Sequence, residues 1–164
     1  MREGKLQIYC GSGKGKTTAA LGQAIKEASL GKSVIVVQFM KCRKADEEIS
    51  FIQRLEPEIK LFRFQRREAA FENLAPEEQQ EEIMNMKNGL NFAKKVLATG
   101  ECDVLILDEV LGLVEQGIVS AEEVHELLGE ASDTTELIFT GIKLCPEMMD
   151  WADDVYQITA LKES

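Results

Sequence analysis

A glycine-rich loop that joins an apolar run to a helix-forming segment constrains the fold of this chain more than any other feature. The apolar run, residues 6–10, has the length of a buried strand, and residues 18–30 have the composition of a helix. Strand, loop and helix in this order are the context in which such a loop binds phosphate groups. We therefore predict that a nucleotide is bound by the loop residues Gly11, Ser12, Gly13, Lys14, Gly15, Lys16, Thr17 and Thr18.

The residue types of the loop suit phosphate for separate physical reasons. Glycines allow a tight turn in which successive backbone N–H groups point into one concavity, and the following helix adds its positive N-terminal dipole. Lys16 can reach the outer phosphates as a mobile charge, and the Thr17 hydroxyl can ligate a phosphate-bound Mg²⁺. Cys10 stands where the usual Gly-x4-Gly-Lys pattern has its first glycine, and Gly11 and Gly13 supply the flexible positions. A flexible Gly-Lys linker is the alternative interpretation.

Length and charge limit the classes of protein that fit this sequence. A chain of 164 residues is long enough for one compact domain, which we predict to span residues 1–164, and 45% hydrophobic residues argue against disorder. The net charge of −10 excludes a general nucleic-acid binder, because such proteins need a basic surface to replace counterions. ATP is compatible with this charge, since its phosphates meet local positive groups rather than the mean charge.

The cysteines and the apolar segments bear on the compartment. The four cysteines, at positions 10, 42, 102 and 145, are far apart and form no Cys-x-x-Cys pair. This spacing suits reduced thiols better than a disulfide framework or a zinc site. No signal peptide is expected, and no run of 18 apolar residues is long enough to span a bilayer. We expect a cytoplasmic protein without a membrane partner.

Apolar runs and helical segments alternate along the chain. The apolar runs typical of strands are 5–10, 33–39, 60–64, 104–108, 136–140 and 155–159. Helices are predicted at 18–30, 46–55, 77–99, 120–128 and 146–151. Several strands are apolar throughout, which is expected when both faces of a sheet are covered, and parallel strands need crossovers of this length. We predict an α/β fold with a mostly parallel sheet of about six strands and helices on both faces.

Polar residues follow two predicted strands at the edge where an open α/β sheet binds its ligands. Asp108 and Glu109 come directly after an apolar run, and Asp108 would reach Mg²⁺, directly or through water. Glu109 could orient a water molecule, a ribose hydroxyl or another polar group. Gln38 and Lys41 follow the second strand and are expected near the phosphate loop, although a solvated loop explains the basic residues around Lys41 equally well.

Three other features are better explained by packing or exposure. Phenylalanines and arginines are interleaved over residues 62–67, and in an acidic chain we assign them to strand packing and a solvated loop rather than to RNA binding. His125 is the only histidine and has no assigned role, so a histidine-based triad and a histidine metal cluster are both excluded. Trp151 is expected to be a packing residue.

From residue 5 to the last predicted strand, the chain resembles the P-loop ATP:corrinoid adenosyltransferases, also called cob(I)alamin adenosyltransferases. The resemblance rests on the phosphate loop 11–20, which shares with the family the lack of a glycine at position 10, and on residues 36–41, 105–109 and 139–141. It implies a RecA-like α/β fold that is commonly dimeric. It also implies ATP, Mg²⁺ and a reduced corrinoid as bound groups, with a flavoprotein-type reductase as the electron donor.

The resemblance further implies the reaction. The 5′-deoxyadenosyl group passes from MgATP to a reduced cobalt(I) corrinoid, and triphosphate is released. Cobalt(I) is the nucleophile, so the protein holds ATP C5′ over the cobalt and stabilises the leaving triphosphate, for which Lys16 and Mg²⁺ are suited. Glu109 and Phe71 complete the implied catalytic set, Phe71 because family members keep water off the lower face of cobalt with aromatic side chains.

The chain departs from the family pattern on the corrinoid side. Where the family has Phe-x-Trp, this sequence has Phe71 but Asn73. Where the family has Thr-Gly-Arg, this sequence has Ile142, followed by Lys143 as the only nearby positive charge. Two alternatives therefore stay open: a P-loop ATPase or small-molecule kinase, which would produce ADP, and a nucleotide-binding regulator without turnover.

Overall fold

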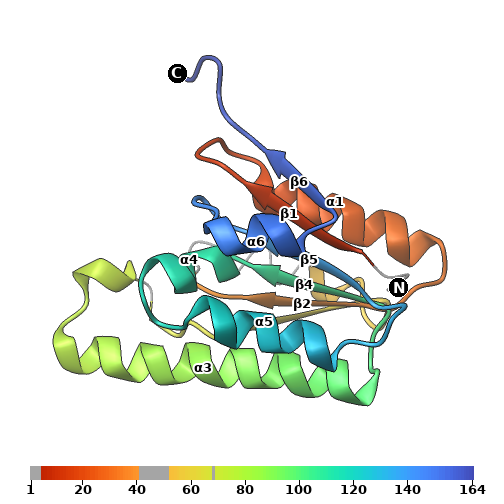
Figure 1. Ribbon diagram of the computed structural model, residues 1–164, viewed down its shortest axis with the longest axis horizontal. Coiled ribbons are helices and arrows are strands. Elements are labelled where there is room, and N and C mark those ends of the chain that lie inside the picture. Colours follow the sequence, from red (N-terminus) through yellow and green to blue (C-terminus); the bar gives the residue numbers. More distant parts are fainter. Residues whose placement is uncertain (1–4, 41–51, 68) are drawn as a thin grey trace.

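The structure is a computed structural model and describes residues 5–40, 52–67 and 69–164. Figure 1 shows a twisted sheet with helices on both sides. The described residues form six strands in the order β3-β2-β4-β5-β1-β6, and every neighbouring pair of these strands is parallel. β5 therefore separates the strand before the phosphate loop from the strand that ends at the acidic pair. The strands are β1 (Leu6–Cys10), β2 (Val34–Gln38), β3 (Ile59–Arg63), β4 (Val104–Asp108), β5 (Glu136–Thr140) and β6 (Asp154–Gln157).

The helices cover the two faces of the sheet unequally. One face is covered by α1 (Lys16–Ser29), whereas the long α3 (Pro76–Thr99) and α5 (Ala121–Glu130) lie on the other face (Figure 1). Two short helices, α4 (Val110–Glu115) and α6 (Pro146–Trp151), pack into the same apolar cluster as α3. A single 3₁₀ turn, η1 (Phe71–Asn73), precedes α3. The predicted covering of both faces is confirmed.

Alternate residues of the central strands enter two separate apolar clusters. On the α1 side, Val36 of β2 packs in one cluster with Ala20 and Ala24. On the α3 side, Ile35 and Val37 belong to the larger cluster, which includes the buried residues of α3, α4 and α5. A strand with apolar layers on both faces has no position for an exposed polar residue, which explains its continuous apolar sequence.

α3 follows the predicted pattern and adds one buried charge. Pro76 occupies its first turn, and Gly100, with φ of 67°, ends it in the left-handed conformation that glycine tolerates. Glu82 is fully buried, and its carboxylate accepts hydrogen bonds of 3.1 Å from the Arg66 backbone N–H and from Asn85 Nδ2. These bonds hold the segment after β3 against the start of α3. The predicted apolar stripe packs in the core, with Ile83 half-buried and the others buried: Met86, Leu90, Ala93 and Leu97.

One helix of the structure was not predicted, and one predicted helix lies largely outside the described residues. The sequence analysis did not include α4, because a helix of 6 residues is too short to display a helical repeat. The helix predicted at 46–55 lies largely outside the described residues.

Within the described part of the chain, no helix has the combination of length and apolarity that a bilayer crossing requires.

Candidate functional site

The phosphate loop packs directly against the chain that follows β6. A Cβ at Gly11 would lie 2.3 Å from the carbonyl oxygen of Ile158, and one at Gly13 would lie 2.9 Å from the same atom. The Gly13 N–H donates a 2.9 Å hydrogen bond to this oxygen. Gly11 also has φ of 116°, a value that glycine adopts without strain. Both glycines are therefore needed to bring the loop onto this segment.

Cys10 explains why the loop works without the usual first glycine. It is the last residue of β1, and its carbonyl oxygen accepts a 2.7 Å hydrogen bond from the Ile158 N–H. Among the described residues the only non-glycine residues with positive φ are Met40 and Glu109, so the backbone at position 10 does not need glycine. Burial raises the pKa of the Cys10 thiol, and the charge of Lys16 opposes this effect. The thiol is therefore protonated at neutral pH.

The open end of the loop lies at the N-terminus of α1. Gly15 is the N-cap residue with φ of 106°, and apart from Gly15 and its two chain neighbours no described residue has an atom within 4 Å of the place where its Cβ would be. Lys16 folds back over the loop, and its Nζ donates a 2.8 Å hydrogen bond to the Gly13 carbonyl oxygen. The first turn of α1 and the Lys16 ammonium thus remain accessible to an anion. The predicted loop residues that are exposed here are Ser12, Lys14, Gly15 and Thr18.

Asp108 is the centre of a hydrogen-bond network that joins α1 to three strands. Its side chain is buried and accepts hydrogen bonds from Thr17 Oγ1 at 2.9 Å, from Thr140 Oγ1 at 2.6 Å and from Gln38 Nε2 at 3.2 Å. The sheet register creates this arrangement, because Gln38 pairs with Asp108 across β2 and β4. The structure therefore brings together three of the predicted site residues, Thr17, Gln38 and Asp108.

Thr17 and Asp108 fit Mg²⁺ by the chemistry of their donor atoms. Both side chains supply hard oxygen atoms, which Mg²⁺ prefers, and these atoms lie within hydrogen-bond distance of each other. Over residues 5–40, 52–67 and 69–164, no group of three or more His, Cys, Asp or Glu side chains is placed to hold a metal ion. The other ligands of a magnesium ion here would be water and phosphate oxygens, as is usual for this metal.

Glu109 has a backbone conformation that is unusual for a residue with a side chain. It is the N-cap residue of α4, with φ of 67° and ψ of 20°. Such a left-handed conformation costs a non-glycine residue roughly 1 kcal/mol. The Glu109 N–H donates a 2.8 Å hydrogen bond to Thr140 Oγ1, which helps to hold the turn. The turn places Glu109 Oε2 near the first turn of α4, 3.6 Å from the position of a Cβ at Gly112.

Two residues of this region, Thr140 and Arg63, have no site role in the sequence analysis. Arg63 belongs to the segment 62–67 that was assigned to strand packing and a solvated loop, and its Nη2 donates a 3.4 Å hydrogen bond to Gln38 Oε1 at the carboxyl end of β3. Thr140 ends β5 and contacts both members of the acidic pair. Each is the last residue of its strand, and in a parallel sheet this position indicates the ligand-binding edge. To predict which site residues they contact, one would also need the order of the strands in the sheet.

Phe71 lies in η1, and α4 links η1 to the acidic pair. Gln79 Nε2 donates a 3.0 Å hydrogen bond to the Phe71 carbonyl oxygen, and Gln116 Nε2, just after α4, donates a 2.5 Å bond to Glu72 Oε1. The Phe71 ring is half-buried and packs against the cluster that contains α3. Lys41, the remaining predicted site residue, lies outside the described residues.

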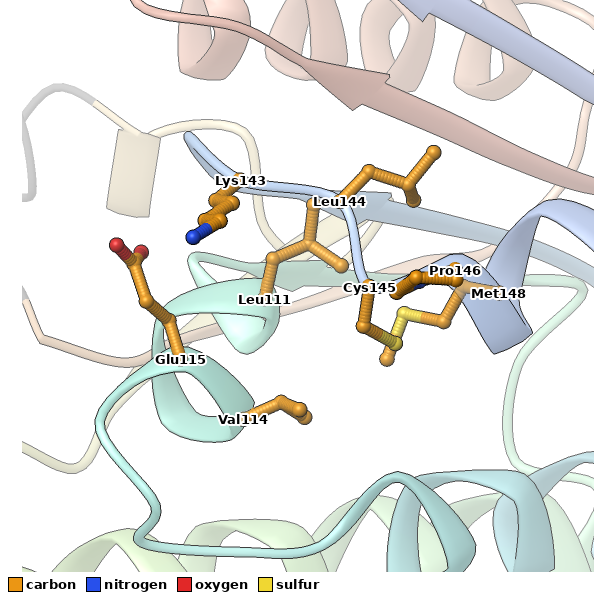
Figure 2. Close-up of a pocket in the computed structure, with 8 residues that line it drawn as sticks. All are labelled: Leu111, Val114, Glu115, Lys143, Leu144, Cys145, Pro146 and Met148. Carbon is orange, nitrogen blue, oxygen red and sulfur yellow. The ribbon is translucent and has the colours of Figure 1, made fainter.

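A pocket opens between α4 and the segment that joins β5 to α6 (Figure 2). Its volume is about 210 Å³. In Figure 2, the Lys143 ammonium and the Glu115 carboxylate lie on the same side of the pocket. The positive charge that follows Gly141 is therefore at this pocket rather than in the phosphate loop. The pocket is lined by Leu111, Val114, Glu115, Lys143, Leu144, Cys145, Pro146 and Met148.

Comparisons with known proteins agree with this geometry. The chain matches the model of the family described as ATP:corrinoid adenosyltransferase BtuR/CobO/CobP over residues 2–164. It is 29% identical to the corrinoid adenosyltransferase of Escherichia coli strain K12 and 30% identical to the corrinoid adenosyltransferase CobA of Salmonella typhimurium strain LT2. Each of these alignments spans 161 residues and covers 98% of this chain and 79% of the relative.

Solved structures with a similar fold include a KaiC-like protein of Pyrococcus horikoshii OT3, with a TM-score of 0.62 and 18% identity over 98% of this chain and 75% of that chain. The flagellar accessory protein FlaH of Methanocaldococcus jannaschii has a TM-score of 0.64 and 14% identity over 96% of this chain and 72% of that chain. The predicted RecA-like P-loop fold is thus confirmed. Because the family model spans the phosphate loop, the acidic pair and all the strands between them, the chain belongs to the ATP:corrinoid adenosyltransferase family.

Proposed function

We propose that this protein transfers the 5′-deoxyadenosyl group of ATP to a reduced cobalt(I) corrinoid and releases triphosphate. The observation that carries the proposal is the network in which Asp108 accepts hydrogen bonds from Thr17, at the start of α1, and from Thr140, at the end of β5. This network brings a carboxylate suited to Mg²⁺ next to the phosphate loop. It does so in a chain whose family is described by ATP and a corrinoid.

The reaction assigns a limited task to the protein. The cobalt(I) corrinoid supplies both electrons of the new bond to C5′ of ATP, and the bond between C5′ and its oxygen breaks. That electron pair leaves with the triphosphate, so no protein nucleophile is needed. The chain has to hold C5′ in line with the cobalt and stabilise the negative charge of the leaving group, and preorganised N–H donors are effective at both tasks.

Lys16 and the Asp108 network perform these tasks in our proposal. Lys16 exchanges its hydrogen bond to the Gly13 carbonyl for the triphosphate, because an anion is the stronger acceptor. Thr17 and Asp108 would hold Mg²⁺, which would supply further positive charge to stabilise the leaving triphosphate. Gln38 and Thr140 keep the carboxylate in place by donating to its oxygen atoms.

Glu109 and Phe71 serve the two substrates on either side of α4. We assign Glu109 to a ribose hydroxyl or a water of bound ATP, and Phe71 to the lower face of the corrinoid. A homodimer, a flavoprotein-type reductase and a cytoplasmic location complete the proposal. The described cysteines are free thiols, which agrees with a reducing compartment: Cys10, Cys102 and Cys145.

A P-loop ATPase or small-molecule kinase is the second candidate function. The observation that favours it is the absence of tryptophan and arginine at Asn73 and Ile142, where the resemblance implies corrinoid or phosphate contacts. Such an enzyme would cleave a phosphoanhydride bond of ATP and would act without a corrinoid.

Phosphorus NMR of the products separates these functions. The protein is incubated anaerobically with MgATP, with and without chemically reduced cobinamide. Triphosphate that appears only with the corrinoid is the expected result. ADP in both tubes would replace the proposal with the ATPase or kinase, and bound but unchanged ATP in both would indicate a regulator.

A further inference from the structure

We infer that the pocket between α4 and the β5–α6 segment binds an amide side arm at the rim of the corrinoid, with Lys143 and Glu115 as its polar contacts. The inference rests on the proposed function, because it gives part of that substrate a place in the protein. It goes further by naming the substrate class: corrinoids whose side arms are amides rather than carboxylates.

The pocket lies close to the phosphate loop, because a backbone hydrogen bond joins the loop to the residue that precedes Lys143. The Gly11 N–H donates to the Ile142 carbonyl oxygen at 2.9 Å, and Ile142 directly precedes Lys143. At the opposite wall, a Cβ at Gly141 would lie 2.3 Å from Leu111 Cβ, so the end of β5 packs on α4 without a gap. A corrinoid whose cobalt faces ATP in this loop therefore brings part of its rim to the pocket.

The lining suits an arm with an apolar stem. Aliphatic and sulfur-containing side chains form most of the wall, and Met148 is fully buried behind it. A water molecule takes up about 30 Å³ of the liquid, so a pocket of about 210 Å³ has room for the two methylenes and the amide group of a propionamide arm. Burial of those methylenes favours binding, as does that of the methyl groups on the corrin rim.

The mouth of the pocket carries the groups that recognise an amide. Lys143 and Glu115 are both exposed, and within the described chain neither side chain takes part in a hydrogen bond or an ion pair. An ammonium donates to the amide carbonyl oxygen, and a carboxylate accepts from the amide N–H. A carboxylate arm in the same place would be attracted by Lys143 but repelled by Glu115. The pair together therefore selects a neutral arm with both a donor and an acceptor.

Filling the pocket tests whether the corrinoid enters it. Val114→Phe enlarges a half-buried lining residue, and we expect the KM for reduced cobinamide to rise roughly tenfold while the KM for MgATP is unchanged. The matched control is Ile25→Phe on the exposed side of α1, which is expected to have the parent's values for both substrates. Triphosphate formation is the measured rate.

Removing the charge of Glu115 or of Lys143 tests whether this pair selects amide arms over carboxylate arms. Both residues are exposed, so we expect their substitution to leave the fold intact. Reduced cobinamide, with amide arms, is compared with reduced cobyrinic acid, with carboxylate arms, and the ratio of their kcat/KM values is the preference. We expect Glu115→Gln to lower the preference for cobinamide about fivefold and Lys143→Gln to raise it by a similar factor. A merely structural role would not move the ratio in opposite directions. Glu130→Gln, at an exposed position in the last turn of α5, is the control.

Trp151 provides a binding measurement that does not depend on turnover. It is the only tryptophan, it ends α6, and α6 also supplies Pro146 and Met148 to the pocket wall. Cobalt(II) corrinoids absorb light in the range of tryptophan emission, so cobinamide binding is followed as quenching, corrected for absorption. We expect Val114→Phe to raise the dissociation constant roughly tenfold, in parallel with the KM.

The outcomes distinguish this inference from the proposed function. If the parent protein forms triphosphate with cobinamide but Val114→Phe and Glu115→Gln keep its KM and its preference, the inference is wrong and the proposed function stands. If the parent forms triphosphate with neither cobinamide nor cobyrinic acid and cobinamide does not quench Trp151, the inference and the proposed function are both wrong. If Val114→Phe alters the oligomeric state in gel filtration without altering the cobinamide KM, the pocket is a contact between copies and the inference is overturned.

Discussion

Thr140 Oγ1 donates a 2.6 Å hydrogen bond to Asp108 Oδ1, and the same hydroxyl oxygen accepts a 2.8 Å hydrogen bond from the Glu109 N–H. One hydroxyl at the end of β5 therefore holds both members of the acidic pair at the end of β4. Asp108 and Thr140 are buried, so the loss of either side chain removes a hydrogen bond from a polar group that is away from water. The position of the carboxylate that faces Thr17 thus depends on Thr140.

Thr140→Val tests this dependence with a side chain of nearly the same shape. We expect the free energy of unfolding to fall by about 1–3 kcal/mol, because the variant removes the hydrogen bonds that the Thr140 hydroxyl makes with Asp108 Oδ1 and with the Glu109 N–H. The KM for MgATP is expected to rise. Urea unfolding and triphosphate formation measure the two effects. Thr140→Ser keeps the hydroxyl and is expected to retain most of both properties, and equal losses in the two variants would contradict the role of the hydrogen bonds.

Lys16→Ala should remove productive ATP binding. Lys16 is the only basic residue in the first turn of α1, so no neighbour in that turn replaces its charge. A charge-assisted hydrogen bond contributes about 1.5–3 kcal/mol, which corresponds to roughly tenfold to a hundredfold in affinity. Isothermal titration with MgATP gives the affinity directly. Lys26→Ala, in the last turn of the same helix, is the matched control. Near-parental ATP affinity in Lys16→Ala would disprove the assignment of the loop.

Asp108→Asn should weaken the binding of the Mg²⁺ that activity requires. The substitution removes the negative charge and presents an amide to Gln38 and Thr17, although the side chain keeps its size. We expect the Mg²⁺ concentration for half-maximal triphosphate formation to rise at least about tenfold. The titration is repeated at a fixed total ATP concentration. A metal titration that matches the parent would remove Asp108 from the metal site.

Phe71→Ala should slow corrinoid turnover and leave ATP binding unchanged. The ring is half-buried in η1, outside the hydrogen-bond network of the phosphate loop. The measured quantities are kcat with reduced cobinamide and the affinity for MgATP. Phe71→Leu separates aromatic character from bulk, since it keeps most of the apolar packing. A fall in ATP affinity as large as the fall in kcat would indicate that Phe71 is a packing residue only.

Cys102 makes stability fall at alkaline pH. Burial raises the pKa of its thiol from 9.0 to about 12, so between these values the unfolded chain loses the proton before the folded protein does. The stabilising contribution is complete below pH 9 and is lost as the pH rises towards 12. The slope approaches about 1.4 kcal/mol per pH unit. Urea midpoints between pH 8 and pH 11 measure it, and Cys102→Ala should flatten the curve; an equal slope in that variant would assign the effect to other groups.

The strands were predictable where both of their faces are apolar. β4 and β5 have the bounds predicted for them, because five consecutive residues are buried or nearly so and no polar residue interrupts them. β6 was predicted at 155–159 but ends at Gln157. The reason is tertiary, since the Ile158 carbonyl oxygen leaves the sheet pattern to accept the Gly13 N–H of the phosphate loop.

The site was predictable in part. Thr17, Gln38 and Asp108 were assigned from local motifs and do meet in space. Thr140 and Arg63 lacked a local motif, and their roles depend on which strands are neighbours. The single domain over residues 1–164, the homodimer and the role of Lys41 stay predictions.

Local patterns in the sequence were enough to predict the class of fold, the phosphate loop and the acidic pair. These rest on residue spacing within a few positions, such as a glycine-rich turn between a strand and a helix or a carboxylate after an apolar run. The contacts between distant residues became visible in the folded protein alone: Thr140 with Asp108, Gly11 with Ile158, and the pocket residues of α4 with those before α6. The physical reason is that strand order and register set these contacts, and both depend on the packing of the whole sheet rather than on any single segment.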